Sequence, residues 1–308
     1  MRTPEPPPPL PANSQVSDAF ATLVAPGATL LSVANEKYYP WEKFKHQTFP
    51  KNVSPQAAWA VLEAIRRHNS RQVPLTTKEG SRFRFWLDDH LLSQVLSIEG
   101  TARDPLQLLE HASAGSIRQG YMLNALMAEG IHSSILEGAA TTRQEAKKML
   151  RDGRPPRNKS EQMVVNNFQT MRQLQAWAKE PLSVERIRQI HASITNDTLA
   201  NPNDAGRLQT EGEQRVRIVG VPDGRVVHSP PPASELPARL RALCKFANND
   251  GAFPPAVVRA AILHFQIGYD HPFVDGNGRT ARALFYWCMR RRGYNLFSYL
   301  TISKAFVG

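Results

Sequence analysis

Residues 255–289 constrain the fold most, because two apolar stretches with helical spacing flank a short loop there. Apolar side chains recur through residues 255–269 at intervals of three and four, and a second helical stretch runs from Gly278 through Met289. Between them lie Pro272 and two glycines, which interrupt regular structure. The sequence therefore predicts a loop that leads directly into the N-terminus of a helix.

This loop has the composition of an anion-binding site. Gly276 and Gly278 let backbone N–H groups turn toward a ligand without interference from a Cβ atom. The helix dipole favours negative charge at the same place. Arg279 and Arg282 lie three residues apart on one helix face and can hold successive phosphates, and Asp275 offers the hard oxygen that Mg²⁺ prefers. Together these residues predict a site for a metal-bound triphosphate.

A candidate base stands at the mouth of this site. His271 begins the loop, and an imidazole titrates near neutrality and can take a proton. Phosphoryl-type transfer needs little more, since positioning and charge neutralisation dominate its catalysis. The alternative for His271 alone is a tight surface turn with a hydrogen-bonded histidine. The whole set of loop residues favours the catalytic interpretation. His191 is expected to pack behind the site.

Most of the remaining chain shows helical periodicity, so we predict an all-α fold. Further helices are expected at 140–151, 160–178, 183–194 and 236–248. Residues 214–228 are the exception, because two β-type segments flank a Pro-Asp-Gly turn and predict a hairpin. A single hairpin is too small to fold alone and should lie on the helical body, where its free edge could accept another chain's strand.

The N-terminal part differs in composition. Residues 1–12 read MRTPEPPPPLPA, a proline run that cannot pack a core. We expect residues 1–36 to be disordered, and residues 37–105 to form a small, mostly helical region that includes a short strand at 82–88. Ser54 and Pro55 have the pattern of an N-cap and a first helical residue. The segment after 105 should place these apolar residues toward a core: Leu108, Leu109, Ile117, Tyr121, Leu123, Leu126 and Met127.

Composition bears on the compartment and on possible partners. The net charge of +11 favours anionic partners, although a solvated basic surface would give the same value. The two cysteines, Cys244 and Cys288, lie in apolar helical stretches and are expected to be buried free thiols in a reducing compartment. No segment is apolar enough to span a bilayer, and 19–34 is a poor signal peptide. We therefore expect a cytoplasmic protein without a membrane partner.

The segment HPFVDGNGRTAR, residues 271–282, matches the signature of the Fic (Fic/Doc, or Fido) family at every fixed position. The segments SSILEGAATTR, GRPPRNKSEQMVVNN and ARALFYWCMRRRGYNLFSYLTIS also resemble a bacterial subgroup of that family, and the resemblance covers roughly residues 37–308. It implies a helical core with a β-hairpin flap, and transfer of AMP from ATP to a Ser, Thr or Tyr hydroxyl of a target protein. The catalytic domain would be 106–308, and the chain would be truncated at its C-terminus relative to this family.

The resemblance assigns roles within the loop. His271 would deprotonate the target hydroxyl, and Asp275 would bind Mg²⁺ between the α- and β-phosphates. Gly278 points toward AMP transfer, since a relative with lysine there phosphorylates instead. The nucleotide-binding set would be Gly276, Asn277, Gly278, Arg279, Thr280, Ala281 and Arg282.

Two further segments gain roles from the same resemblance. Residues 133–138 fit the family's inhibitory motif, with Ser133, Glu137 and Gly138 at its fixed positions. A Glu137 carboxylate paired with Arg282 would take away the partner of the γ-phosphate. The hairpin 214–228 would be the flap that aligns an extended target segment through these residues: Val216, Arg217 and Ile218.

Several alternatives stay open at this stage. The loop reads phosphates and not the base, so another nucleotide or another group could be transferred, or AMP could be removed. Auto-modification and a homodimer are both expected possibilities for a chain of this family. A regulatory, DNA-associated module is the alternative of a different class, although nucleic acid is not an expected partner of this chain because no helix-turn-helix pattern fits after the last core helix.

Overall fold

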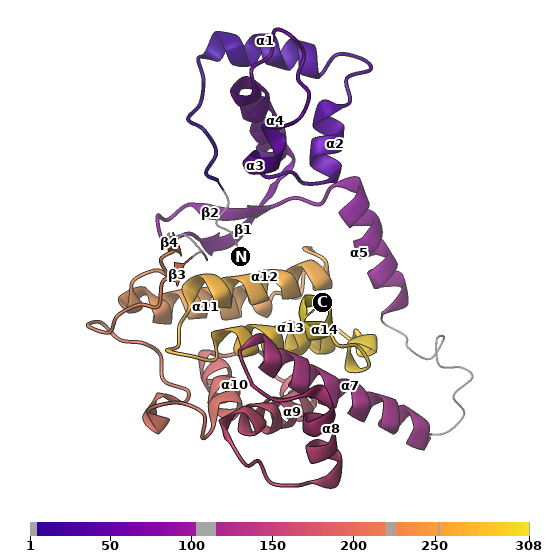
Figure 1. Ribbon diagram of the computed structural model, residues 1–308, viewed down its shortest axis with the longest axis vertical. Helices are drawn as coiled ribbons and strands as arrows, with labels where there is room; N and C mark the ends of the chain where they lie inside the picture. The colour runs from indigo at the N-terminus through magenta and orange to yellow at the C-terminus, as the bar shows by residue number, and fades with distance from the viewer. Residues whose placement is uncertain (1–4, 103–114, 220–223, 225, 252, 308) are drawn as a thin grey trace. The chain divides into compact units, whose positions relative to one another are not determined.

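The computed structural model describes residues 5–102, 115–219, 224, 226–251 and 253–307, and its elements are labelled in Figure 1. The described chain divides into two compact units, one of residues 1–94 with 217–228 and one of residues 95–216 with 229–308. Helices predominate in both, so the fold is mostly helical, as predicted. None of the helices described is long and apolar enough to cross a membrane.

The first unit is built around helix α4. Its helices are α1 (Asn13–Leu23), α2 (Leu30–Glu36), α3 (Trp41–Phe44) and α4 (Pro55–Asn69). The predicted cap of α4 is confirmed, because the Ser54 side chain accepts a hydrogen bond from the Ala57 N–H at 3.2 Å, and Pro55 is the first helical residue. Trp41, Phe44 and Trp59 are buried together in one apolar cluster with residues of α1 and α2.

The expectation of disorder over residues 1–36 is wrong for residues 13–36. Helices α1 and α2 occupy most of that segment. Ala19 and Leu23 lie four residues apart on α1, Leu31 and Ala34 lie three apart on α2, and all four are buried in the cluster around α4. The proline-rich composition therefore ends before α1, and the apolar spacing of this segment outweighs Pro26 and the glycine after it.

Two small antiparallel sheets complete the first unit. Strand β1 (Arg71–Thr76) pairs with β2 (Arg82–Phe85), which lies within the predicted strand at 82–88. The sequence did not indicate β1, whose interior contains Pro74. Strand β3 (Ile218–Val219) pairs with β4 (Val226–His228), so the predicted hairpin is confirmed, while most of its predicted turn lies outside the described residues. The division into units places 217–228 with the first unit, not with the predicted domain 106–308.

The second unit is a helical body around α13. Its elements are α7 (Gly115–Leu136), α8 (Arg143–Asp152), α9 (Lys159–Trp177), α10 (Val184–Thr195), α11 (Leu236–Ala247), α12 (Ala256–Asp270), α13 (Asn277–Arg291) and α14 (Ser303–Val307), with α5 (Asp89–Thr101) beginning in the first unit and short 3₁₀ turns between helices. Helix α13 packs against α7, α9, α10 and α12, which explains why most of its residues are buried.

The two cysteines belong to this body. Cys244 on α11 and Cys288 on α13 are free and buried, as predicted. Burial raises the pKa of the Cys244 thiol to about 12 and that of Cys288 to about 11. Both thiols are therefore poor nucleophiles in the folded protein.

Candidate active site

The loop that connects α12 with α13 has the boundaries that the sequence predicted. Helix α12 ends at Asp270, and His271 follows in the left-handed region with φ 44° and ψ 58°, where its N–H donates to the Ile267 carbonyl at 2.9 Å. Helix α13 begins at Asn277, directly after Gly276. The His271 imidazole therefore stands where α12 ends, six residues before the first turn of α13.

Asn277 fixes the shape of the loop. Its Oδ1 accepts the Phe273 N–H at 3.0 Å, and its Nδ2 donates to the Phe273 carbonyl at 2.8 Å. The side chain is almost fully buried, so both bonds are shielded from water. The amide group of Asn277 therefore closes the loop, and the nucleotide-binding role of this residue stays a prediction.

A histidine from α10 supports the loop from behind. The His191 ring stacks on Phe273 with centroids 3.7 Å apart and an angle of 7° between the planes. Its Nδ1 accepts the Gly206 N–H at 2.9 Å, so the ring proton sits on Nε2, which donates to the Asp275 carbonyl at 2.8 Å. Burial is the main reason that the pKa of His191 falls to about 4. His191 is a neutral structural group that packs behind the loop, as expected.

Gly276 is required by its surroundings. Its φ of 79° is one that side chains rarely adopt, and a Cβ atom there would lie 2.6 Å from Cγ2 of Thr195 and 3.2 Å from Nε2 of His191. The backbone of the loop thus approaches α10 as closely as it can. This contact sets the direction in which α13 starts.

Asp275 is the acidic residue of the loop, and its side chain is 53% exposed. Its Oδ1 accepts the Gly276 N–H at 2.6 Å and lies 3.8 Å from the Arg279 guanidinium. Arg279 is buried, donates to the Ile194 carbonyl at 3.3 Å, and has a pKa lowered by that burial. An exposed carboxylate beside a fixed cation gives this end of the loop one oxygen donor for a metal.

Arg282 is engaged by the end of α7. Its Nε donates to Ser133 Oγ at 2.7 Å, and its Nη2 donates to the Ser133 carbonyl at 3.0 Å and to Glu137 Oε1 at 2.8 Å. Gly138, in the left-handed region with φ 86°, follows the last turn of α7. The residues that the sequence paired, Glu137 and Arg282, are therefore in direct contact across 145 positions of the chain.

The Glu137 carboxylate also lies over the first turn of α13. A Cβ atom placed on Gly278 would be 2.1 Å from Glu137 Oε1 and 3.2 Å from an Arg282 nitrogen. The carboxylate consequently lies against Gly278 in the first turn of α13, a residue that the sequence predicted to bind the nucleotide. Within the described chain, this acidic group is the anion that the site holds.

The comparison with known families identifies the domain that carries this loop. Residues 181–289, which run from just before α10 through nearly all of α13, match the model of the Fic/DOC family. This part of the chain is a Fic/DOC domain.

Curated relatives resemble a longer part of the chain. The protein adenylyltransferase fic-1 of Caenorhabditis elegans is 27% identical over 197 residues, which cover 62% of this chain and 36% of that protein. The protein adenylyltransferase Fic of Nematostella vectensis is 32% identical over 116 residues, which cover 37% of this chain and 24% of that protein. The chain thus matches about a third or less of the length of these relatives.

Solved structures share the fold. A Fic family protein from Desulfovibrio desulfuricans G20 superimposes with a TM-score of 0.54 at 21% identity, covering 70% of this chain and 61% of that one. Fic-1 from Caenorhabditis elegans gives a TM-score of 0.52 at 18% identity, covering 85% of this chain and 68% of that one. At these identities the likeness establishes the fold of the Fic/DOC domain.

Two further residues of the predicted nucleotide-binding set, Thr280 and Ala281, are buried. Thr280 Oγ1 donates to the Gly276 carbonyl at 2.9 Å, and Ala281 is buried, so both side chains stabilise the start of α13.

Of the residues in the predicted flap, Val216 and Arg217 are exposed, and Ile218 begins β3. Val216 belongs to the second unit, whereas Arg217 and Ile218 belong to the first unit.

Residues that the sequence did not indicate hold the backbone next to His271. The Asp270 carboxylate is fully buried and pairs with Arg239 Nε of α11 at 2.7 Å. Arg215 donates through Nη2 to the Asp270 carbonyl at 2.6 Å and through Nε to the Pro231 carbonyl at 3.0 Å. No local pattern marks these contacts, because each joins residues more than a dozen positions apart.

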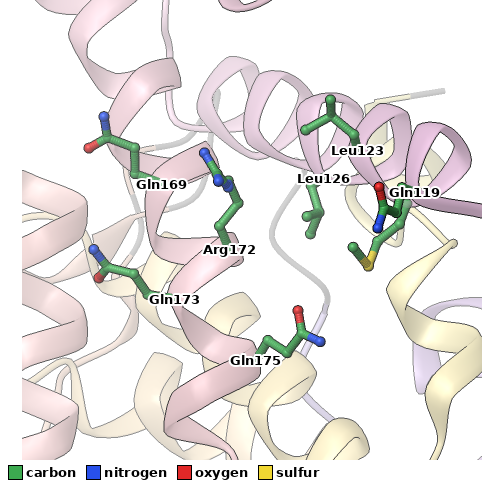
Figure 2. Close-up of a pocket in the computed structure, with 8 residues that line it drawn as sticks. Gln119, Leu123, Leu126, Gln169, Arg172, Gln173 and Gln175 are labelled. Atoms are coloured by element: carbon green, nitrogen blue, oxygen red, sulfur yellow. The ribbon is translucent and has the colours of Figure 1, made fainter. Parts of the chain in front are cut away.

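A separate pocket of about 710 Å³ lies between α7 and α9, as Figure 2 shows. Tyr121 and Leu123 of α7 were expected to face a core but are 59% and 43% exposed, whereas Leu126 and Met127 are buried as predicted. The pocket is lined by Gln119, Met122, Leu123, Leu126, Gln169, Arg172, Gln173 and Gln175. None of these was predicted to hold the nucleotide.

Proposed function

We propose that this chain is an autoinhibited protein adenylyltransferase, which transfers AMP from ATP to a Ser, Thr or Tyr hydroxyl of a target protein. One observation carries the proposal. A single loop joins a histidine, an exposed carboxylate and a helix N-terminus, and a buried arginine one turn into that helix is held by the acidic residue that directly follows α7. The names of the curated relatives support this reaction. The catalytic part would be residues 106–308, which act in the cytoplasm on an extended target segment aligned by the hairpin 214–228.

The chemistry begins with a proton transfer to His271. Its Nδ1 lies 3.4 Å from the Gly268 carbonyl oxygen, which can only accept, so the ring proton is favoured on Nδ1 and Nε2 is left to take a proton. The target hydroxyl loses its proton to Nε2, and its oxygen attacks the α-phosphorus of ATP. The bond from that phosphorus to the bridging oxygen breaks, AMP stays on the target oxygen, and pyrophosphate leaves.

The first turn of α13 would hold the phosphates during this step. Its backbone N–H groups and the helix dipole favour negative charge. Arg279 would hold the β-phosphate and Arg282 the γ-phosphate. Because both guanidinium groups are buried and fixed, little reorganisation is needed when charge moves to the leaving group.

Asp275 fits a magnesium ion shared with a nucleotide. Mg²⁺ typically takes one or two carboxylates together with substrate phosphates, and Asp275 is one exposed carboxylate at the phosphate end of the loop. Among the described residues there is no cluster of three acidic, histidine or cysteine ligands, so the donor set fits a shared ion and not a fixed protein cage. When bound, Mg²⁺ would neutralise charge on the triphosphate and on the leaving pyrophosphate.

Glu137 would act as a brake on this reaction. It occupies Arg282, so a γ-phosphate would find its partner already paired. Two unit charges about 4 Å apart repel by roughly 4 kcal/mol at the screening typical of a protein surface, which corresponds to about a thousandfold in affinity. ATP in its productive position therefore requires the carboxylate to leave.

The test is the intact mass of the chain after incubation with Mg·ATP. We expect strong addition of AMP to the Glu137→Gly variant, less to the wild type and none to the His271→Ala variant. Glu211→Gly, an exposed loop glutamate, and His90→Ala, an exposed histidine, are matched controls that should behave like the wild type. A folded Glu137→Gly variant that is labelled no faster than the wild type would refute the brake, and labelling that survives in His271→Ala would refute the proposed base.

A second experiment tests which nucleotide is the donor and whether the site also removes AMP. The Glu137→Gly variant is offered ATP, UTP, GTP and CTP, each labelled at the α-phosphate, and we expect ATP to be the preferred donor. Preference for another nucleotide would change the transferred group but not the loop chemistry. Wild-type protein mixed with AMP-modified product tests removal of AMP, which would give Glu137 a second role.

A further inference from the structure

The two carbonyls that flank His271 are each held by the segment that precedes the hairpin. The Gln209 N–H donates to the Pro272 carbonyl at 2.9 Å, and Arg215 Nη2 donates to the Asp270 carbonyl at 2.6 Å. His271 itself lies in the left-handed region with φ 44°, which residues other than glycine seldom adopt. Such a conformation persists only where the surrounding contacts fix it. These two bonds hold in place the backbone that carries the proposed base.

The Arg215 guanidinium joins three parts of the second unit. Besides its bond to the Asp270 carbonyl, its Nε donates to the Pro231 carbonyl at 3.0 Å, and its Nη1 donates to the Gln209 side-chain oxygen. All three acceptors are uncharged oxygens, and burial is the main reason that the pKa of Arg215 is lowered. A guanidinium carries its donors in a rigid planar fork, so the three bonds form together only when the three segments keep one arrangement.

Two of these three parts are the ends of the hairpin. Arg215 lies three residues before β3, which begins at Ile218, and Pro231 lies three residues after β4, which ends at His228. One side chain therefore connects both ends of the hairpin to the carbonyl that precedes His271. In the proposed reaction the hairpin aligns the target segment, so the placement of its ends would decide where the target hydroxyl lies.

The turn between Gln209 and Arg215 is closed by its own contacts. Arg207 forms a bidentate pair with the Glu213 carboxylate, at 2.7 and 3.0 Å. The same carboxylate accepts the Thr210 N–H at 2.6 Å, and its pKa falls to about 2, chiefly because Arg207 donates to it. This closed turn holds Gln209 and Arg215 at a fixed spacing.

We propose that Arg215 is a positioning residue of the transfer reaction, which ties both ends of the hairpin to the backbone of His271 and so keeps the target hydroxyl in line with the base. This role rests on the proposed function, because it concerns the same base and the same hairpin. The Asp270 side chain is anchored independently, since its carboxylate accepts from Arg239 at 2.7 Å and from Gln266 at 3.0 Å. Loss of Arg215 therefore removes the tie without releasing the end of α12.

The experiment compares Arg215→Ala, Arg215→Lys and the control Arg241→Ala, each combined with Glu137→Gly. Arg241 is an exposed arginine of α11 that does not belong to these hydrogen bonds. Addition of AMP is followed by intact mass against the concentration of Mg·ATP, which gives a maximal rate and the concentration at half-maximal rate. In parallel, the imidazole Cε1–H peak of His271 is followed by NMR, with its assignment from its loss in His271→Ala, and folding is checked by urea denaturation.

We expect Arg215→Ala to lower the maximal rate by about tenfold to a hundredfold, the size of effect that a misplacement of about 1 Å produces, with less than about a threefold change in the Mg·ATP concentration at half-maximal rate. Arg215→Lys keeps the charge but not the planar fork, so its rate should lie between those of the alanine variant and the Glu137→Gly parent. The His271 peak should move in Arg215→Ala and stay in place in Arg241→Ala.

A folded Arg215→Ala variant with an unmoved His271 peak would overturn the proposal, and so would full activity of Arg215→Lys, because charge alone would then suffice. If Arg215→Ala does not fold, Arg215→Lys decides through the same two readouts. An inactive Glu137→Gly parent would refute the proposed function itself. An active parent with an equally active Arg215→Ala variant would instead refute only the role of Arg215.

Discussion

His191 makes the stability of the second unit depend on pH in a way that can be calculated. Its imidazole is fully buried and its pKa is lowered from 6.5 to about 4, mainly by burial. Protonation would also disturb the acceptor role of Nδ1 toward the Gly206 N–H. The folded protein therefore resists a proton that the unfolded chain accepts readily.

The sign follows from which state binds more protons. Above pH 6.5 neither state is protonated at this group and its contribution to stability is complete. As pH falls below 6.5 the unfolded chain gains a proton first, so the free energy of unfolding decreases until pH approaches 4. With the two pKa values given above, the loss between pH 7.5 and pH 5 is about 2 kcal/mol.

The measurement is a pair of urea denaturation curves at pH 7.5 and pH 5, for the wild type and for His191→Gln, followed by fluorescence. Glutamine can still donate to the Asp275 carbonyl but does not titrate. The free energy of unfolding of the variant should therefore fall by about 2 kcal/mol less than that of the wild type over this interval. Equal losses in the two proteins would show that His191 takes up a proton in the folded state, and the account of its buried neutral ring would be wrong.

Three further substitutions separate structural roles from chemical ones. Asn277→Ala leaves the buried N–H and carbonyl of Phe273 without partners and should lower the free energy of unfolding by about 2–5 kcal/mol, as measured by denaturation. Asp275→Ala, at an exposed side chain, should change that free energy by less than about 0.5 kcal/mol, yet abolish Mg²⁺-dependent AMP transfer. Tyr286→Phe removes the hydroxyl that donates to the buried Glu129 and should cost about 1–3 kcal/mol in thermal or urea unfolding.

Local signals in the sequence located the parts of the fold that depend on local chemistry. Ser54 accepts a hydrogen bond from an N–H three residues later, as its N-cap pattern predicted, and Ser183 does the same at the start of α10. The loop at 271–276 ends α12 and starts α13 where glycine and proline predicted it. In these cases a few consecutive residues determine the backbone conformation.

Elements that depend on distant partners were less predictable. Strand β1 exists because β2 pairs with it, although Pro74 weakens its own strand pattern. Apolar residues occur on several faces of α7, so the sequence does not show which of them are buried. The packing of α7 against α9 covers Leu126 and leaves Tyr121 exposed. Helices α1 and α2 likewise gain their stability from the cluster around α4.

The candidate site shows the same difference between local signals and long-range contacts. The residues themselves indicated a phosphate loop, but the pairing of Glu137 with Arg282 came from resemblance to a family, because nothing in two segments 145 positions apart encodes a contact. Arg215 and Arg239 support the backbone next to His271 through tertiary bonds that leave no local pattern, whereas His191 was expected to pack behind the site. The sequence therefore predicted the chemical groups of the site better than the contacts that support them.

The contact between α7 and α13 would make the proposed brake both specific and reversible. Residues four apart along α7 and its end contact residues four apart along α13, in the opposite chain direction. The contacts are Glu129 with Tyr286, Ser133 with Arg282, and Glu137 with Arg282 and Gly278. The pair Glu129–Tyr286 is fully buried and holds the two helices together. At the outer end the Glu137 side chain is a quarter exposed, pairs with Arg282 and lies beside the first turn of α13. The helix dipole typically adds about 0.3–1 kcal/mol for a carboxylate at an exposed site and up to about 2 kcal/mol when the site is partly buried. In the proposed reaction a nucleotide phosphate would compete with the carboxylate for Arg282, and the carboxylate would be displaced without separating the helices.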